Sequence, residues 1–204
     1  MLDGKSKMVL YAYGAYKHSV DVSFSASRFC LIDRGITFGI AHVRGGSELG
    51  NHWHEESKFS KKINTFKDYI SCSNYLIEQK YTYKGGICFL GGSAGGLTGS
   101  AVANMAPELF FSMLLLVPFC DPLTTMLNEK LPLTPSEWEL WGNPIKSKKY
   151  FESILSYSPY NNLRKTSYPP MFVTTSLFDS RVLYSEPVKY IACLLYTSPS
   201  PRDS

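Results

Sequence analysis

The chain has 204 residues, which is enough for one domain with a substantial core and too few for two ordinary ones. Hydrophobic residues make up 44% of the sequence and charged residues 19%, a balance typical of a soluble globular protein. The formal net charge of +4 is spread along the chain without a basic block, which argues against nucleic acid as a partner. No apolar stretch is long enough to span a membrane, and the first residues lack the apolar core of a signal peptide.

The five cysteines are scattered along the chain, and no two of them have the C-x-x-C spacing. A zinc site or a disulfide framework is therefore not expected, and we predict neither a metal nor a cofactor. Buried and reduced thiols fit a reducing compartment, so the predicted location is cytoplasmic.

Five short apolar runs alternate with helical patterns, which predicts an α/β fold with a mostly parallel sheet and helices on both faces. The runs are nearly continuous rather than alternating, as expected for strands that are buried on both faces. The predicted strands are residues 8–13, 38–43, 87–90, 113–117 and 171–175.

Two helices are predicted around the third strand. Before it, apolar residues recur at helical spacing, and Thr65 and Asp68 have the spacing of a capping box at the helix start. After it, a helix begins just beyond Ser93 and ends before Pro107. Residues 118–170 are rich in Pro, Asn, Ser and Tyr, and we expect an insertion with short helices there.

The segment Gly91-Gly92-Ser93-Ala94-Gly95-Gly96 fits the pattern G-x-S-x-G between a predicted strand and a predicted helix. Such a turn lifts a serine hydroxyl above the end of a sheet, and the glycines let the chain turn tightly. The motif predicts Ser93 as a nucleophile, with the backbone N–H of Ala94 as a donor to the developing oxyanion. A structural Gly-Ser turn or a phosphate-binding loop is the alternative. The segment lacks the Lys-Ser/Thr ending of a P-loop, and it lacks the full dinucleotide-binding fingerprint with its downstream acidic residue.

A serine hydrolase of this kind places an acid and then a histidine after the nucleophile. Asp121 and Asp179 both follow predicted strands. We expect Asp121, which is flanked by prolines, to cap the next element, whereas Asp179 suits the acid that orients the histidine. All four histidines precede Ser93, so we expect that the chain stops before its catalytic histidine and is inactive by itself.

Further short motifs stand in a fixed order along the chain: LYAYGAY at 10–16, DRG at 33–35, AHVRGGSELG at 41–50, NTF at 64–66, VPF at 117–119, PLT at 132–134, WGNP at 141–144, YSPY at 157–160 and DSRV at 179–182. Together with the Ser93 segment they resemble the prolyl oligopeptidase family of serine peptidases, and most closely its oligopeptidase B branch. The resemblance covers roughly residues 8–194.

In that family an N-terminal β-propeller caps an α/β-hydrolase domain and admits only short peptides. The resemblance implies that residues 1–194 are part of such a catalytic domain, with a propeller elsewhere in the full-length protein and short peptides as substrates. Residues 195–204 contain prolines that cannot continue the preceding helical pattern. We expect them to be a non-native or disordered tail.

The resemblance also implies roles for individual residues. Ser93 matches the nucleophile and Asp179 the acid of the triad. Tyr13 matches a tyrosine whose hydroxyl joins the Ala94 N–H in the oxyanion hole, and Arg181 matches an arginine that holds a substrate carbonyl.

Glu137 and Glu139 match the acidic pair that gives the oligopeptidase B branch its preference for cleavage after arginine or lysine. Paired carboxylates select a guanidinium through charge-assisted hydrogen bonds, although solvated acids at a helix terminus are an equal alternative without the resemblance. Tyr16 stands where prolyl-specific members have phenylalanine, which disfavours strict proline specificity. A prolyl-specific peptidase, a general esterase and a non-catalytic relative that binds peptides or proteins remain the rival interpretations.

Overall fold

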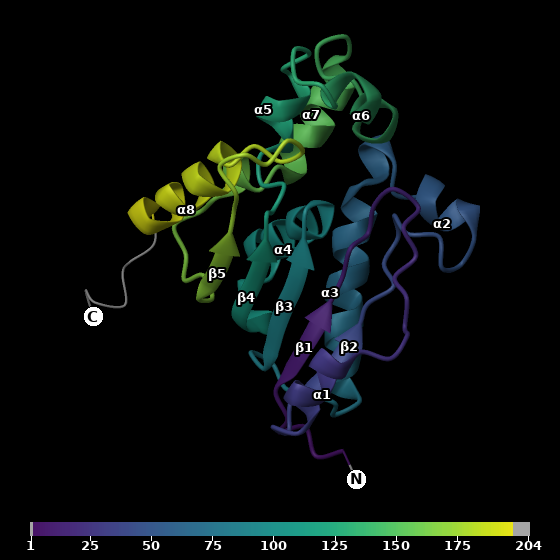
Figure 1. The fold of residues 1–204 in the computed structure, drawn as a ribbon, viewed down its shortest axis with the longest axis vertical. Coiled ribbons are helices and arrows are strands. Elements are labelled where there is room, and N and C mark those ends of the chain that lie inside the picture. The colour runs from purple at the N-terminus through teal and green to yellow at the C-terminus, as the bar shows by residue number, and fades with distance from the viewer. Residues whose placement is uncertain (1, 198–204) are drawn as a thin grey trace.

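The computed structural model describes residues 2–197 and contains a five-stranded parallel sheet in the order β2-β1-β3-β4-β5. Figure 1 shows the strands side by side with β3 in the centre. All five predicted strands are confirmed, although their ends differ by a few residues. They are β1 (Met8–Tyr11), β2 (Thr37–Ile40), β3 (Ile87–Gly92), β4 (Phe110–Leu116) and β5 (Met171–Thr174).

Helices cover both faces of the sheet because the chain reverses its direction across the sheet after β2. Connections between parallel strands are right-handed, so crossovers that run in opposite directions lie on opposite faces. The chain passes from β1 to β2 through α1 (Ala26–Ile32), and from β2 to β3 through α3 (Ile63–Glu78). Helix α4 (Ala94–Met105) then leads to β4 and packs against α3 (Figure 1). The predicted α/β architecture is therefore confirmed.

The core lies where β3 meets α4. The side chains of Ile87, Phe89 and Leu97 are fully buried. Residues 94–104 of α4 are all buried as well, and most of them are small. Since α4 is buried on all sides, it packs closely on the sheet and brings its N-terminus to the carboxyl end of β3.

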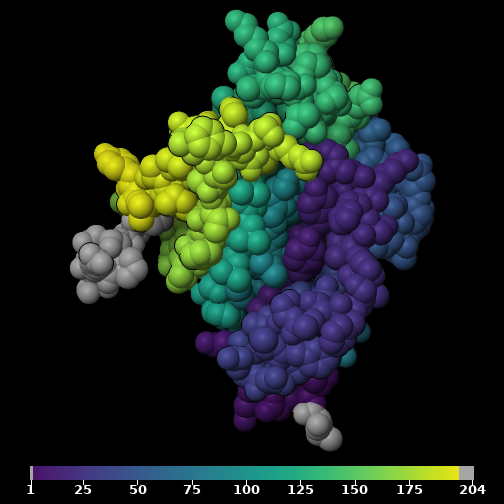
Figure 2. Space-filling view, in the orientation of Figure 1, coloured from purple at the N-terminus to yellow at the C-terminus, as the bar shows by residue number. Residues whose placement is uncertain are grey.

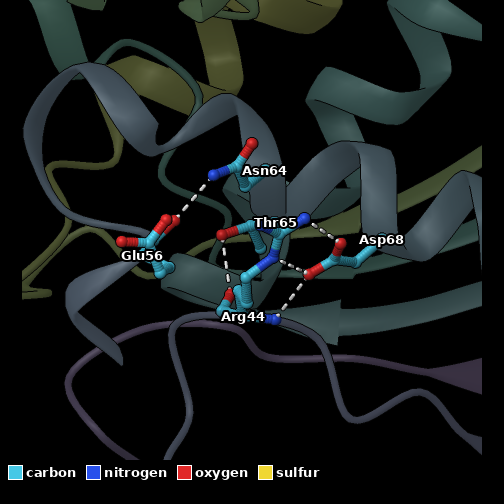
Figure 3. A network of polar contacts seen from close by, with 5 residues as sticks. All are labelled: Arg44, Glu56, Asn64, Thr65 and Asp68. Carbon is cyan, nitrogen blue, oxygen red and sulfur yellow. Dashed lines mark hydrogen bonds and ion pairs between the residues drawn. The ribbon is translucent and has the colours of Figure 1, made fainter. Parts of the chain in front are cut away.

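The start of α3 differs from the prediction. The helix begins at Ile63, and no side chain caps it. Thr65 Oγ1 instead donates a hydrogen bond to the carbonyl oxygen of Arg44 over 2.7 Å, and Asp68 accepts from the guanidinium and the backbone N–H of Arg44 (Figure 3). The predicted capping box is wrong because the loop that follows β2 binds both side chains.

The segment after β4 forms the predicted insertion of short helices. These are α5 (Pro122–Met126), α6 (Thr134–Trp141) and α7 (Lys148–Tyr157), followed by a 3-10 turn at Tyr160–Asn162. Figures 1 and 2 show this segment gathered beyond the carboxyl ends of the strands. Asp121 caps α5 as predicted, since its carboxylate accepts the backbone N–H of Thr124.

The remaining elements are short, apart from the last described helix. They are α2 (Asn51–Glu55) and two 3-10 turns at Phe59–Lys61 and Pro107–Leu109. Helix α8 spans Ser185–Thr197, so the helix continues past the predicted start of the tail at residue 195. Residues 198–204 of that predicted tail lie outside the described residues, and its non-native origin stays a prediction.

The first turn of α8 is anchored to the insertion by buried polar groups. The carboxylate of Glu186 accepts the backbone N–H of Asp121 and the hydroxyl of Thr125. Lys189, on the next turn, forms an ion pair with the Asp121 carboxylate. Burial raises the pKa of Glu186 to about 7, while its hydrogen bonds act in the opposite direction. These contacts hold the loop between β5 and α8 against α5.

A buried lysine lies behind the carboxyl end of β1. Lys62 is 1% exposed, and its ammonium donates a hydrogen bond to the carbonyl oxygen of Gly14. The same ammonium lies 5.1 Å from the centre of the Trp141 ring and 5.9 Å from that of Phe66. Cation–π contacts and one carbonyl replace its lost hydration only in part. Burial accordingly lowers the pKa of Lys62 to about 7.

Replacing Lys62 with methionine is expected to change how stability depends on pH. Between about pH 7 and pH 10.5 the unfolded chain holds a proton at Lys62 that the folded chain has lost. This lysine therefore makes the folded state more stable as the pH rises through that interval, and its full destabilising effect is present below the folded pKa. We expect the Lys62→Met variant to have a higher free energy of unfolding than the unmodified chain near pH 7 and to lose that advantage near pH 10. Urea unfolding followed by tryptophan fluorescence at several pH values measures the difference.

Lys61→Met is the matched control, because Lys61 is the neighbouring residue and its exposed side chain pairs with Glu56 at the surface. It removes the same charge without changing a buried group. The prediction is contradicted if the difference in free energy of unfolding between Lys62→Met and the unmodified chain stays the same across the whole pH interval.

Candidate active site

Ser93 lies at a sharp turn between β3 and α4, where the G-x-S-x-G motif predicts it. Its backbone angles are φ 54° and ψ −121°, a conformation that residues other than glycine rarely adopt. Two hydrogen bonds hold the turn: the Ser93 N–H donates to the carbonyl oxygen of Leu116 over 2.9 Å, and its own carbonyl accepts the N–H of Phe119 over 3.0 Å. The segment at the end of β4 therefore fixes the strained residue.

Close packing explains the glycines on either side of Ser93. A Cβ atom at Gly91 would lie 2.9 Å from the carbonyl oxygen of Ala12, and one at Gly95 would lie 2.7 Å from the same atom. A Cβ atom at Gly96 would lie 2.4 Å from Cα of Pro118. Any side chain at these positions would push the turn away from the ends of its neighbouring strands.

A pocket of about 800 Å³ opens beside Ser93. Its walls come from the loop after β1, the start of α4, the insertion and the loop after β5. Figure 2 shows the purple segment after β1 and the yellow-green segment after β5 meeting at this end of the molecule. The pocket brings together five of the predicted site residues, namely Tyr13, Ser93, Ala94, Glu137 and Arg181.

Tyr13 and Ala94 offer two donors beside the serine. Burial raises the pKa of the Tyr13 phenol, against a smaller lowering by a hydrogen bond with the Ser93 side chain and by the charge of Arg181. The phenol therefore keeps its proton at neutral pH and can donate a hydrogen bond. Ala94 is the first residue of α4, where backbone N–H groups have no partner within the helix. Both donors are thus available to a negative charge that forms next to Ser93.

Glu137 supplies a carboxylate to the pocket wall. One of its oxygens accepts the phenol of Tyr16 over 2.8 Å and the indole N–H of Trp141 over 2.6 Å. Burial, together with the neighbouring Glu137 charge, raises the pKa of Tyr16, so Tyr16 remains a donor to Glu137. These two hydrogen bonds orient the carboxylate and leave its other oxygen free to bind a cationic ligand.

Glu139 is placed differently from Glu137. It is exposed and does not belong to the residues that line the pocket. Residues two positions apart on a helix point to different sides, which fits the different surroundings of the two acids on α6. The family resemblance predicted that the two acids act as a pair, whereas in the structure only Glu137 lines the pocket that contains Ser93.

Asp179 and Arg181 lie in the loop between β5 and α8. The Asp179 carboxylate accepts the backbone N–H groups of Arg181 over 2.8 Å and of Val182 over 2.9 Å, which orients it. Arg181 lines the pocket and has an exposed side chain. Asp179 itself is not among the lining residues, and its role as the triad acid stays a prediction.

Among the residues that the structure describes, no histidine is hydrogen-bonded to the Ser93 hydroxyl. His18 lines the pocket, with its ring centre 5.1 Å from that of Tyr13. His54 lies on α2 and is buried, with Nδ1 3.2 Å from the carbonyl oxygen of Gly45, and burial lowers its pKa. His42 and His52 are exposed.

The sequence did not single out several residues of the pocket wall. Lys17, His18 and Ser19 follow Tyr13 directly, and Thr125 and Met126 come from α5. The first three could have been suspected from their position directly after the Tyr13 motif. The other two could have been suspected from their position on the helix that Asp121 caps. Within residues 2–197 no helix is long and apolar enough to cross a membrane, and no group of three acidic, histidine or cysteine side chains could hold a metal ion.

Known proteins with similar sequences are peptidases. Dipeptidyl aminopeptidase BI of Pseudoxanthomonas mexicana is 50% identical over 192 residues, which cover 94% of this chain and 26% of the relative. Protease 2 of Moraxella lacunata is 47% identical over 192 residues, covering 94% of this chain and 28% of the relative. The chain thus spans only about a quarter of the length of these relatives.

Solved structures agree with the sequence comparison. Oligopeptidase B from Leishmania major superposes with a TM-score of 0.95 at 43% identity, over 98% of this chain and 28% of that one. Oligopeptidase B from Trypanosoma brucei, solved with covalently bound antipain, gives a TM-score of 0.93 at 41% identity, over 96% of this chain and 28% of that one. The parallel sheet described above is therefore that of an α/β-hydrolase fold.

The family assignment rests on most of the chain. The model of the prolyl oligopeptidase family matches residues 22–200, a range that includes the Ser93 turn and the loop that carries Asp179. The chain belongs to the prolyl oligopeptidase family of serine peptidases.

Proposed function

We propose that the protein carrying this chain is a serine oligopeptidase that cleaves short peptides after arginine or lysine through an acyl-enzyme. The observation that carries the proposal is a single pocket in which a strained serine, a protonated tyrosine and an oriented glutamate meet. Each of these groups performs a different task on a peptide bound beside Ser93.

In the proposed reaction Ser93 Oγ attacks the carbonyl carbon of the scissile bond. The carbonyl oxygen gains negative charge as the tetrahedral intermediate forms, and the Tyr13 hydroxyl and the Ala94 N–H donate hydrogen bonds to it. Collapse of the intermediate expels the amine and leaves an ester on Ser93, which water then hydrolyses.

Proton transfer in this mechanism requires an imidazole. Asp179, whose carboxylate is oriented by two backbone N–H groups, is proposed to hold and orient that imidazole. We propose that the histidine comes from a part of the protein outside residues 1–204, and that a β-propeller there limits access to short peptides. The five unpaired thiols support a cytoplasmic location for this protein.

Selection of arginine or lysine is proposed to depend on Glu137. Its carboxylate is anchored by Tyr16 and Trp141, so it need not be reorganised when a cation binds. The Tyr16 phenol also occupies pocket space with a polar group, which disfavours proline at the same position. A prolyl-specific peptidase or a general esterase does not require a carboxylate in this pocket. A non-catalytic relative that binds peptides does not require a serine held in a strained conformation.

Tyr13→Phe is expected to lower kcat by about a hundred-fold or more in a complete enzyme that carries this chain, because one oxyanion donor is lost. KM should change little, since the hydroxyl acts mainly in the transition state. Steady-state kinetics with an arginyl-peptide substrate measure both constants. Tyr11→Phe is the matched control, because Tyr11 lies on β1 and does not line the pocket. Equal losses in the two variants would show that Tyr13 has no special role.

Glu137→Gln is expected to lower kcat/KM for arginyl substrates by about ten-fold or more, while norleucine substrates are affected much less. The amide keeps the shape of the side chain and removes its charge. Glu139→Gln measures the contribution of the exposed acid in the same assay. The basic-residue specificity fails if both variants keep the original ratio of arginine to norleucine rates.

The chain of residues 1–204 is expected to hydrolyse an arginyl-peptide substrate no faster than the Ser93→Ala variant does. Without an imidazole partner the serine remains a weak nucleophile, and loss of one triad member removes several orders of magnitude in rate. A fluorogenic peptide assay on the two purified chains provides the comparison. A serine-dependent rate typical of complete peptidases would contradict this expectation.

A further inference from the structure

The pocket beside Ser93 carries more positive than negative charge. Lys17, His18 and Arg181 line it, and Glu137 is the one acidic residue among its described lining residues. Lysine and arginine are both charged at neutral pH, and an imidazole donates a hydrogen bond whether or not it is charged. A pocket that selects a basic side chain would be expected to carry the opposite balance.

Among the described residues, the basic side chains of the pocket form no ion pair. In the described part of the chain, none of the ion pairs includes Lys17, His18 or Arg181. Glu137 already accepts two hydrogen bonds from Tyr16 and Trp141. The basic side chains at the pocket wall are therefore available to bind an anionic group of a ligand.

The loop that carries Lys17 and His18 is held in a tight and strained conformation. Tyr16 and Lys17 both have φ 58°, which non-glycine residues rarely adopt. The Lys17 N–H donates to the carbonyl oxygen of Gly45 over 3.0 Å, and the Lys17 carbonyl accepts the hydroxyl of Ser47 over 2.8 Å. Strain of this kind persists only where surrounding contacts enforce it, so the backbone that carries Lys17 and His18 is held in place.

The cations also lie close to the reacting atoms. The His18 ring centre is 5.1 Å from that of Tyr13, the proposed oxyanion donor. The charge of Arg181 is near enough to favour the ionised form of the same phenol. A group that binds His18 therefore lies close to the bond that Ser93 attacks, and Lys17 lines the same pocket.

We propose that this pocket prefers peptides that carry a carboxylate close to the scissile bond, with Lys17 and His18 as its specificity-determining residues. The carboxylate is either the free C-terminus of a short peptide or an acidic side chain next to the cleaved residue. A substrate with both a basic side chain and a nearby carboxylate matches the pocket, because Glu137 meets the first group and the cations meet the second. The inference rests on the proposed function for the identity of the pocket as a substrate site.

Equilibrium binding to a complete enzyme that carries this chain, with Ser93→Ala, tests this preference without hydrolysis. Calorimetry compares acetyl-Gly-Arg-Gly with a free carboxylate and the same peptide as its amide. A second pair, acetyl-Gly-Arg-Asp-amide and acetyl-Gly-Arg-Asn-amide, separates a side-chain carboxylate from a terminal one. We expect the carboxylate-bearing member of at least one pair to bind about three-fold or more tightly, and the ratio to shrink at high ionic strength.

Replacing Lys17 and His18 together with glutamine should bring the affinity ratio within each pair to about one. Lys148→Gln is the matched control, because its side chain is 88% exposed on α7 and it does not line the pocket. Equal affinities within both pairs, or a ratio that survives the double substitution, would overturn the proposal.

A third comparison keeps this inference separate from the proposed function. Citrulline in place of arginine removes the cation but preserves the shape of the substrate side chain. If citrulline peptides bind as well as arginine peptides, the basic-residue specificity fails, whereas the carboxylate ratio still decides the inference by itself. If no peptide binds at all, both proposals fail.

Discussion

The close approach of the Ser93 turn to the ends of β1 and β4 is the constraint on which the site depends. The turn lies so near Ala12 and Pro118 that no side chain fits at Gly91, Gly95 or Gly96. Its strained residue is held by hydrogen bonds to Leu116 and Phe119. Because these contacts come from the end of β4 and the residues directly after it, the serine is positioned by the edge of the sheet rather than by a flexible loop. The helix N-terminus and Tyr13 are brought beside it by the same packing.

The fold could be predicted from the sequence largely because each strand is buried on both faces. Such strands form continuous apolar runs, and their alternation with helices leaves few other architectures. The capping box at Thr65 and Asp68 failed for the opposite reason. Both side chains are recruited by Arg44, which lies on a distant loop, and a local pattern contains no information about such a contact (Figure 3). Local rules therefore succeed in the core and fail where long-range polar contacts compete.

The site was predictable to different depths at different residues. Ser93 and Ala94 follow from a motif with a mechanical reason, whereas Tyr13, Glu137 and Arg181 could be assigned only by resemblance, since each is an ordinary residue type in an ordinary loop or helix. The geometry of α6 then separates Glu137 from Glu139, which the sequence alone could not do without knowing where the helix faces. Lys17 and His18 escaped notice because exposed polar residues after a strand are common.

Lys62 connects these parts of the molecule. Its ammonium binds the Gly14 carbonyl, next to Tyr13, and lies over the ring of Trp141, whose indole N–H binds Glu137. The segments that carry Tyr13 and Glu137 thus both contact the side chain of one buried lysine. A buried charge without a carboxylate partner costs stability, and an apolar residue of similar volume would fill the space with less penalty. The hydrogen bond and the ring contact of Lys62 link the loop after β1 to α6, a link that an apolar side chain could not make through a hydrogen bond.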